Sequence, residues 1–383
     1  MARAYDTIVL GLGAMGSAAL QHLTDRGQRA LSVEAFGPGH ANGSTHGRTR
    51  MIRQAYSEGA DYIPLVRRAY QLWRELEARC GRDLLTVTGG VLAGRPGSWV
   101  VEGAAASAER HGLPFERLDA AEVNARWPAF ALTGDLAAGF EPRAGFLDPE
   151  ACVAAGVALA VAGGAEVRWH ERVRAWRADG AGVRVETDHG VHAAGSLVVT
   201  AGAWSGRLLA GLGLPLVVWR VYNVFLQPDV EDLAVPERLP VFLMDLPEGE
   251  FYGVPALTGE GAKIGRHDAG VPTDPDAVDR DVTAAEVEAV RRPVTGRVPG
   301  VAGRVLRATT CLYTLTPDRH FIVDRHPGHA QVVYACGFSG HGFKFAAAIG
   351  EALAELVVDG RASLPVGFLS AGRFRRPPGD LSR

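Results

Sequence analysis

A glycine-rich turn close to the N-terminus constrains the fold of this chain more than any other feature. Residues 6–10 (DTIVL) form a short apolar run that ends directly in GLGAMG, with glycines at Gly11, Gly13 and Gly16. The next stretch, SAALQHLTDRG, has apolar residues at helical spacing, and a second apolar run ends at Glu34. Strand, glycine turn, helix, strand and terminal acid is the order of a dinucleotide-binding βαβ unit. The sequence therefore predicts an α/β fold that begins with a Rossmann-type site.

The same segment indicates which dinucleotide is bound. Gly11 permits the tight turn, Gly13 lets the backbone approach a pyrophosphate, and Gly16 lets helix and strand pack closely. Glu34 is placed to accept hydrogen bonds from ribose hydroxyls, which disfavours the 2′-phosphate of NADP. The following GPGHANGSTHGRTRMIRQAY is a loop with a basic end, not the second βαβ unit of an NAD domain. FAD, which needs a loop over its second phosphate, is the preferred cofactor, and NAD stays as the alternative.

Composition narrows the classes of function. The 383 residues carry a formal net charge of −3, and no basic stripe is present, so nucleic acid is not an expected partner. No apolar run reaches the roughly eighteen residues that a membrane span needs. The N-terminus enters a strand with no room for a signal peptide. Four widely spaced cysteines predict neither a disulfide framework nor a metal site. We expect a cytoplasmic protein without membrane or metal.

Nucleotide-type patterns at both ends of the chain, with a different middle, predict a discontinuous domain. Helices are expected over 149–162, with Asp148 as N-cap, over 342–358, and over 100–126, with a break before Pro128. The stretch from 166 to 204 has strand character. We expect an FAD-binding domain, an inserted substrate domain on a mixed sheet, and a flexible tail, with these bounds: 1–85 plus 146–214 plus 318–372, 86–145 plus 215–317, and 373–383.

Lysine usage marks two positions. Of the forty Lys and Arg residues only two are lysine, Lys263 in GAKIGRH and Lys344 in SGHGFKF. Lysine differs from arginine because its charge is compact and its pKa shifts readily on burial. Two leftover lysines on a solvated surface are the plain alternative. Because both have Gly and His as close neighbours, we expect both in a functional site.

Four further motifs carry a resemblance to a known family. With the N-terminal fingerprint, STHGRTRMIRQAY, AKIGRH, CLYTLTPDRHFIVD and GFSGHGFKF follow in order. The chain thus resembles the monomeric sarcosine oxidase family, which includes N-methyltryptophan oxidase and pipecolate oxidase, from residue 5 to about residue 360. The resemblance implies an FAD domain like that of glutathione reductase and a substrate domain on a mixed sheet. It further implies a monomer that oxidises the C–N bond of a secondary amino acid to an imine and reduces O2 to H2O2.

The resemblance assigns roles to one cysteine and three cations. Cys311 in CLYTLT corresponds to the cysteine joined to the flavin 8-methyl carbon, whereas alone it would be taken as a small core residue. Arg53 and Lys344 correspond to the pair that binds the substrate carboxylate, a guanidinium fork plus an ammonium. Lys263 corresponds to the lysine beside the flavin where oxygen is reduced, because a cation there stabilises developing negative charge.

Other site residues follow from the same resemblance. His267 and Tyr252 match residues that tune the protonation of the amine, which must be neutral to have a lone pair. Arg50 and His46 match a pair near the flavin ring, where positive charge favours the reduced anion. Two more residues are expected to line the site, with core packing as the alternative: Tyr313 and His341. The full set of expected FAD contacts is Gly11, Gly13, Ala14, Met15, Gly16, Glu34, Ser44, Thr45, Arg50, Val173, Ala201, Gly202, Trp204, Cys311, Gly337, Gly340, Gly342 and Lys344.

Departures from the family pattern leave the substrate open. Arg48 stands where an acid or a neutral residue is common, and Arg266 replaces what is often an aromatic or apolar residue. Segments 96–145 and 215–250 match weakly, although they shape the pocket. A sarcosine-like amino acid is the first choice, and larger N-methyl amino acids and cyclic imino acids are alternatives. A flavin dehydrogenase that reduces a quinone or carrier protein, and a subunit dependent on partner chains, also stay open; Lys263 favours the oxidase.

Overall fold

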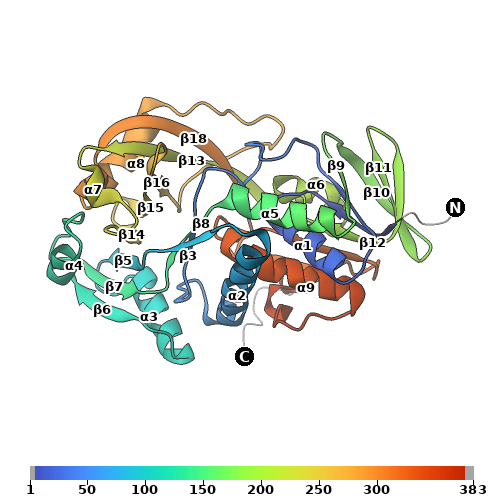
Figure 1. Ribbon diagram of the computed structural model, residues 1–383, viewed down its shortest axis with the longest axis horizontal. Helices are drawn as coiled ribbons and strands as arrows, with labels where there is room; N and C mark the ends of the chain where they lie inside the picture. The colour runs from blue at the N-terminus through green and yellow to red at the C-terminus, as the bar shows by residue number, and fades with distance from the viewer. Residues whose placement is uncertain (1–4, 376–383) are drawn as a thin grey trace.

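The computed structural model describes residues 5–375. Two large sheets lie side by side, and a small third sheet lies between them (Figure 1). The third sheet joins three short strands: β3 (Arg50–Ile52), β4 (Leu85–Val87) and β8 (Gly145–Leu147). The predicted α/β class with a mixed second sheet is confirmed.

The first sheet extends the N-terminal nucleotide unit. Its strands are β1 (Tyr5–Leu10), β2 (Ala30–Val33), β9 (Glu166–Arg168), β10 (Val173–Asp179), β11 (Gly182–Thr187), β12 (Val191–Val199), β19 (Ile322–Arg325) and β20 (Val332–Cys336). The order is β10-β11-β12-β1-β2-β9, with β20 beside β12 and β19 beside β20. Strands β12, β1, β2, β9 and β20 are linked by parallel pairings. The carboxyl ends of β1 and β2 therefore open towards one site.

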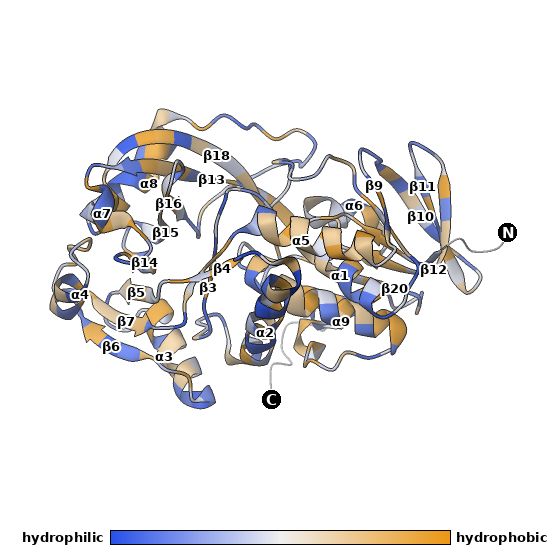
Figure 2. Cartoon of the chain, in the orientation of Figure 1, coloured by the Kyte–Doolittle hydropathy of each residue, from blue (hydrophilic) through white to orange (hydrophobic). Residues whose placement is uncertain are grey.

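Four helices cover this sheet: α1 (Ala14–Asp25), α2 (Ile63–Cys80), α5 (Pro149–Ala162) and α9 (Ala346–Val358). Helix α1 packs against both α5 and α9, and Gly350 of α9 lies so close that an added Cβ would stand 2.4 Å from the Cβ of Ala18. Asp148 caps α5 as predicted, because its carboxylate accepts from the backbone N–H of Ala151. In Figure 2 the visible side of α2 is largely hydrophilic, while its apolar residues, among them Val66 and Trp73, are buried in the core.

The second sheet is mixed. Its strands are β5 (Gly90–Gly94), β6 (Glu116–Asp119), β7 (Ala137–Glu141), β13 (Val217–Pro228), β14 (Val241–Leu246), β15 (Gly249–Leu257), β16 (Gly261–Arg266), β17 (Val271–Pro272) and β18 (Gly303–Leu315). Only β5 and β14 pair in parallel. The helices of this half are α3 (Trp99–His111), α4 (Ala120–Arg126), α7 (Glu231–Ala234) and α8 (Ala284–Thr295).

One expected helical stretch is broken. Residues 100–126 contain strand β6 between α3 and α4, because Gly112 ends α3 in the left-handed conformation with φ of 60°. Strand β6 then pairs with β7, a partner distant in sequence that local periodicity does not reveal. Every strand of the first sheet falls in the segments assigned to the FAD-binding domain, and every strand of the second in those assigned to the substrate domain. The domain division itself stays a prediction.

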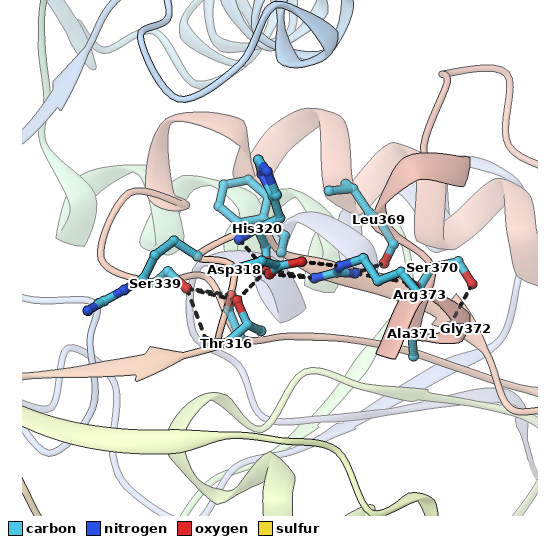
Figure 3. Close-up of polar contacts among 12 residues, drawn as sticks. Thr316, Asp318, His320, Ser339, Leu369, Ser370, Ala371, Gly372 and Arg373 are labelled. Atoms are coloured by element: carbon cyan, nitrogen blue, oxygen red, sulfur yellow. Dashed lines mark hydrogen bonds and ion pairs between the residues drawn. The ribbon is translucent and has the colours of Figure 1, made fainter. Parts of the chain in front are cut away.

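The C-terminal segment is anchored beyond residue 372. Arg373 lies in a short 3-10 helix (Ala371–Arg375) and donates to Asp318 Oδ2 at 2.7 Å and to the carbonyl of His320 at 2.9 Å (Figure 3). This guanidinium therefore ties residue 373, where the expected tail begins, to the turn after β18. Residues 376–383 of that tail lie outside the described residues. Within residues 5–375, no helix is long and apolar enough to cross a membrane.

Candidate active site

The glycine turn has the geometry that the fingerprint predicts. Gly11 has φ of 86°, and an added Cβ would stand 2.8 Å from the carbonyl of Thr200. At Gly16 an added Cβ would lie 1.8 Å from the carbonyl of Gly11, so helix and turn can meet only at glycine. Gly13 is the N-cap of α1 and makes no side-chain capping bond, although the N–H of Ala14 donates to Oγ1 of Thr45 at 3.3 Å. The positive end of the helix dipole still lies at this turn and suits an anion such as a pyrophosphate.

Glu34 ends β2 with its carboxylate held in place. Oε2 accepts from the N–H of Leu12 at 2.8 Å, and Oε1 accepts from the N–H of Phe36 at 3.0 Å. Burial opposes the charge, but His40 and these N–H donors together hold the pKa of Glu34 below its ordinary value. An ionised acid at this position suits ribose hydroxyls and repels a 2′-phosphate.

A cavity of about 480 Å³ runs from this turn into the second sheet. Nearly all predicted site residues line it: Gly11, Gly13, Ala14, Met15, Glu34, Ser44, Thr45, Arg50, Arg53, Val173, Ala201, Gly202, Trp204, Tyr252, Lys263, His267, Cys311, Tyr313, Gly337, Gly340, His341, Gly342 and Lys344. Two of the predicted site residues are not among those that line it: Gly16 and His46. Residues that the sequence predicted from distant parts of the chain therefore line one cavity. Their roles stay predictions.

Cys311 lies on β18 beside three basic groups. Its Sγ is 3.8 Å from Nη2 of Arg50. Burial raises the pKa of the thiol, but His46, Arg50 and Lys263 outweigh it and lower the pKa to about 7. The buried Nε2 of His46 has no hydrogen-bond partner among the described residues. A substantial fraction of the Cys311 thiol is therefore ionised near neutral pH, in the neighbourhood of His46.

The two lysines lie in the same cavity and are both buried. Lys263 of β16 donates from Nζ to the carbonyls of Thr49 at 2.8 Å and Gly47 at 3.2 Å. Burial and the neighbouring Arg50 lower its pKa well below the ordinary value. Lys344 donates to the carbonyl of His341 at 2.9 Å, and burial lowers its pKa to about 7.

Arg53 faces the cavity as an ion pair. Its Nη2 donates to Oε2 of Glu58 at 2.6 Å, and its Nη1 donates to the carbonyl of Ala55 at 2.8 Å. Burial would raise the pKa of Glu58, but Arg53, His341 and Lys344 lower it to about 2. Sequence reasoning missed Glu58, because a single acid in a loop has no periodicity and no motif of its own. Any carboxylate that binds Arg53 must share the guanidinium with Glu58 or displace it.

Neutral polar side chains also line the cavity. Tyr252 donates to Oδ1 of Asn223 at 2.5 Å, and Asn223, on β13, is a second lining residue that the sequence did not reveal. The imidazole of His267 lies 3.4 Å from the hydroxyl of Tyr313. Burial lowers the pKa of His267 to about 4, so this ring is uncharged near pH 7.

Comparison with known proteins now decides the family. The model of the family described as FAD dependent oxidoreductase matches residues 6–356. The chain belongs to this family. Monomeric sarcosine oxidase of Streptomyces avermitilis is 42% identical, covering 99% of this chain and 100% of that protein. Monomeric sarcosine oxidase of Bacillus sp. strain B-0618 is 39% identical over 97% of each. N-methyl-L-tryptophan oxidase of Yersinia pestis is 34% identical over 97% of this chain and all of its own length.

Solved structures agree with this membership. The amino acid oxidase NikD, described as essential for nikkomycin biosynthesis, superposes with a TM-score of 0.85 at 27% identity over 96% of this chain and 98% of its own. An L-proline dehydrogenase from P. horikoshii has the same fold, with a TM-score of 0.85 at 24% identity over 98% of this chain and 99% of its own. The predicted family resemblance and the dependence on FAD are confirmed, and the glycine turn, Glu34 and the unpartnered His46 fit that cofactor.

The two departures from the family pattern are not lining residues of the cavity. Arg48 is 45% exposed and pairs with Glu260 at 3.3 Å and Asp148 at 3.8 Å. Arg266 pairs with Asp268 at 2.7 Å. Both guanidinium groups are therefore neutralised outside the site of this FAD-dependent oxidoreductase. Further lining residues that sequence reasoning did not name include Met51, Trp99, Arg172, Arg207, Leu243 and Asp276.

Proposed function

We propose that this protein oxidises the C–N bond of a secondary amino acid, with a small N-methyl amino acid of the sarcosine type as the first candidate. One observation carries the proposal: two buried cations, Arg53 and Lys344, face a single cavity beside the FAD site. A guanidinium and an ammonium at one place form a site for a carboxylate. The names of the relatives, sarcosine oxidase and N-methyl-L-tryptophan oxidase, favour the same class of substrate.

The amine end of the substrate meets neutral groups. Oxidation of an amine requires the free lone pair, so a bound ammonium has to lose its proton first. His267, with a pKa of about 4, is an unprotonated imidazole at neutral pH. The hydroxyl of Tyr252 already donates a hydrogen bond to Oδ1 of Asn223. We infer that the uncharged His267 tunes the protonation of the bound amine, while Tyr252 and Asn223 orient the substrate.

When bound, FAD would supply the two-electron oxidation of the substrate and the transfer of those electrons to O2. The glycine turn and Glu34 would hold its nucleotide half, and Arg50, beside His46, would supply positive charge at the ring end. In its protonated form Lys263, fixed by two backbone carbonyls, keeps one N–H for oxygen or a water. This preorganised cation would stabilise negative charge that develops on oxygen. We propose that the imine product is then hydrolysed by water and that a single chain performs the whole reaction.

We also propose that FAD is linked covalently through Cys311. The lowered pKa of its thiol and the adjacent Arg50 favour the reactive thiolate. Linkage would replace the S–H bond and one C–H bond of the 8-methyl group by a C–S bond, and the two electrons and two protons released would pass to O2.

A peroxide assay on the purified chain tests the proposal. Sarcosine, N-methyl-L-alanine, N-methyl-L-tryptophan, L-proline and L-pipecolate would be supplied in air, with glycine as the primary-amine control. The proposal expects H2O2 from at least one secondary amino acid and far less from glycine. Flavin reduction without H2O2 would instead indicate a dehydrogenase, and no reaction with any member would refute the assignment.

A further inference from the structure

Tyr56 lies directly behind the two carboxylate-binding cations. It follows β3 in the loop that carries Arg53, it is fully buried, and it is not one of the residues that line the cavity. The guanidinium carbon of Arg53 lies over its ring at 4.8 Å from the centroid. Nζ of Lys344 lies over the same ring at 5.0 Å. One aromatic ring therefore contacts both cations on which the proposed function depends.

The ring is fixed by a hydrogen-bonded chain. Nε2 of His341 is 2.9 Å from the carbonyl of Arg319, which can only accept, so Nε2 carries the proton. Nδ1 is then an acceptor, and the hydroxyl of Tyr56 donates to it. The carbonyl of the same His341 accepts from Nζ of Lys344 at 2.9 Å. The hydroxyl of Ser107 holds the backbone carbonyl of Tyr56 at 2.7 Å. Tyr56 and Lys344 are thus anchored to one residue.

The charges around Lys344 show why such a ring matters. Arg53 and Lys344 are both buried, and only one carboxylate, that of Glu58, is close enough to influence both within the described residues. An aromatic face attracts cations through its quadrupole, and this attraction is larger for desolvated cations than for exposed ones. The groups that face Lys344 are Glu58, Arg53 and Tyr56 from the loop after β3, His267 from the end of β16, and His341 from its own loop.

We propose that Tyr56 is a positioning residue of the carboxylate site: its ring face holds the heads of Arg53 and Lys344 in place and helps to keep Lys344 protonated. The inference rests on the proposed function, because it assumes that these two cations bind the substrate carboxylate. The hydroxyl of Tyr56 orients the ring, and the ring itself supports the charges.

A binding titration tests this role apart from turnover. Methoxyacetate has the shape of sarcosine with an ether in place of the amine, so it can occupy the site without being oxidised. Its dissociation constant would be read from the change in visible flavin absorbance at pH 6 and pH 8. The proteins are the wild type, Tyr56→Phe, and position 56 carrying pentafluorophenylalanine, which keeps the ring shape but removes its negative face. Flavin content and thermal midpoint report whether each protein is folded.

We expect Tyr56→Phe to bind methoxyacetate within a few-fold of the wild type, because the ring face remains. The pentafluorinated ring should weaken binding by about ten-fold at pH 8, where Lys344 more easily loses its proton, and by less at pH 6. If the fluorinated protein binds methoxyacetate as tightly as the wild type does at both pH values, the role of Tyr56 is overturned. Equal losses for the phenyl and pentafluorophenyl rings would also overturn it, since then only the hydroxyl matters. A wild type that binds no carboxylate would instead contradict the proposed function.

Discussion

Replacement of Arg53 by methionine should lower both the stability of the protein and its affinity for the substrate carboxylate. Arg53 is 4% exposed and its partner Glu58 is 16% exposed at the side chain, so the variant leaves a carboxylate enclosed without its closest counter-ion. The pKa of Glu58 lies at about 2 instead of 4.5, and a shift of this size is worth about 3 kcal/mol. Loss of one partner of a buried pair costs a similar amount, about 3–5 kcal/mol. Because Lys344 and His341 stay near Glu58, we expect about 3 kcal/mol.

The pH dependence of this loss has a defined sign. The pKa of Glu58 is depressed in the folded protein, so its contribution is present above its ordinary pKa and is lost as the pH falls towards 2. In Arg53→Met that contribution shrinks, and the deficit relative to the wild type should be largest near neutral pH. For a chain of 383 residues, about 3 kcal/mol corresponds to a thermal midpoint lower by about 4 °C.

A second substitution distinguishes the two effects. Arg53→Met combined with Glu58→Gln removes the unpaired charge, so most of the lost stability should return while binding of sarcosine or methoxyacetate stays weak. The control is Arg48→Met, which removes an exposed arginine and should cost at most about 1 kcal/mol. Thermal melts at pH 5 and pH 8 and flavin-monitored titrations measure both quantities. The reasoning fails if Arg53→Met is as stable as the control, or if the double variant recovers carboxylate binding.

Three further predictions concern the other basic groups and the cysteine. Lys263→Met should slow reoxidation of the flavin by O2 by about 100-fold while sparing anaerobic reduction, as stopped-flow absorbance would show; equal loss in both half-reactions would contradict the assigned role. Cys311→Ala should yield flavin that acid precipitation releases, whereas Cys336→Ala, at a buried cysteine whose pKa is raised to about 12, should keep it in the pellet. The wild-type affinity for methoxyacetate should fall by about ten-fold or more as the pH rises through 7. The reason is that the pKa of Lys344 is about 7, so its ammonium is lost above that value. A constant affinity from pH 6 to pH 9 would show that Lys344 does not hold the carboxylate.

Features encoded in short segments were predictable from the sequence. The turn at Gly11 and Gly16 is dictated by backbone contacts that exclude any side chain, so the glycines themselves report the geometry. Lys263 and Lys344 were selected because lysine is rare in this chain, and both are buried in the cavity. The reason is physical: a buried cation in a shaped site tolerates little variation, whereas exposed positive charges here are arginine.

Features that depend on distant partners were not predictable. Strand β6 exists because it pairs with β7, and its four residues have no pattern of their own. Glu58 and Tyr56 are important through what they contact. Their contacts with Arg53 lie within one loop that has no sequence pattern of its own. The contacts of Tyr56 with Lys344 and His341 form only when the loop after β3 meets the loop before α9. The roles of the site residues, the monomeric state and the cytoplasmic location stay predictions.

The most direct test follows both halves of the reaction in one experiment. The purified protein would be mixed without oxygen with the best secondary amino acid of the panel, and air would then be admitted while flavin absorbance and H2O2 are recorded. The account predicts that the visible absorbance bleaches, returns in air, and yields one H2O2 for each amino acid oxidised. A flavin that no secondary amino acid reduces, or one that stays reduced in air and reoxidises only with a quinone, would contradict it.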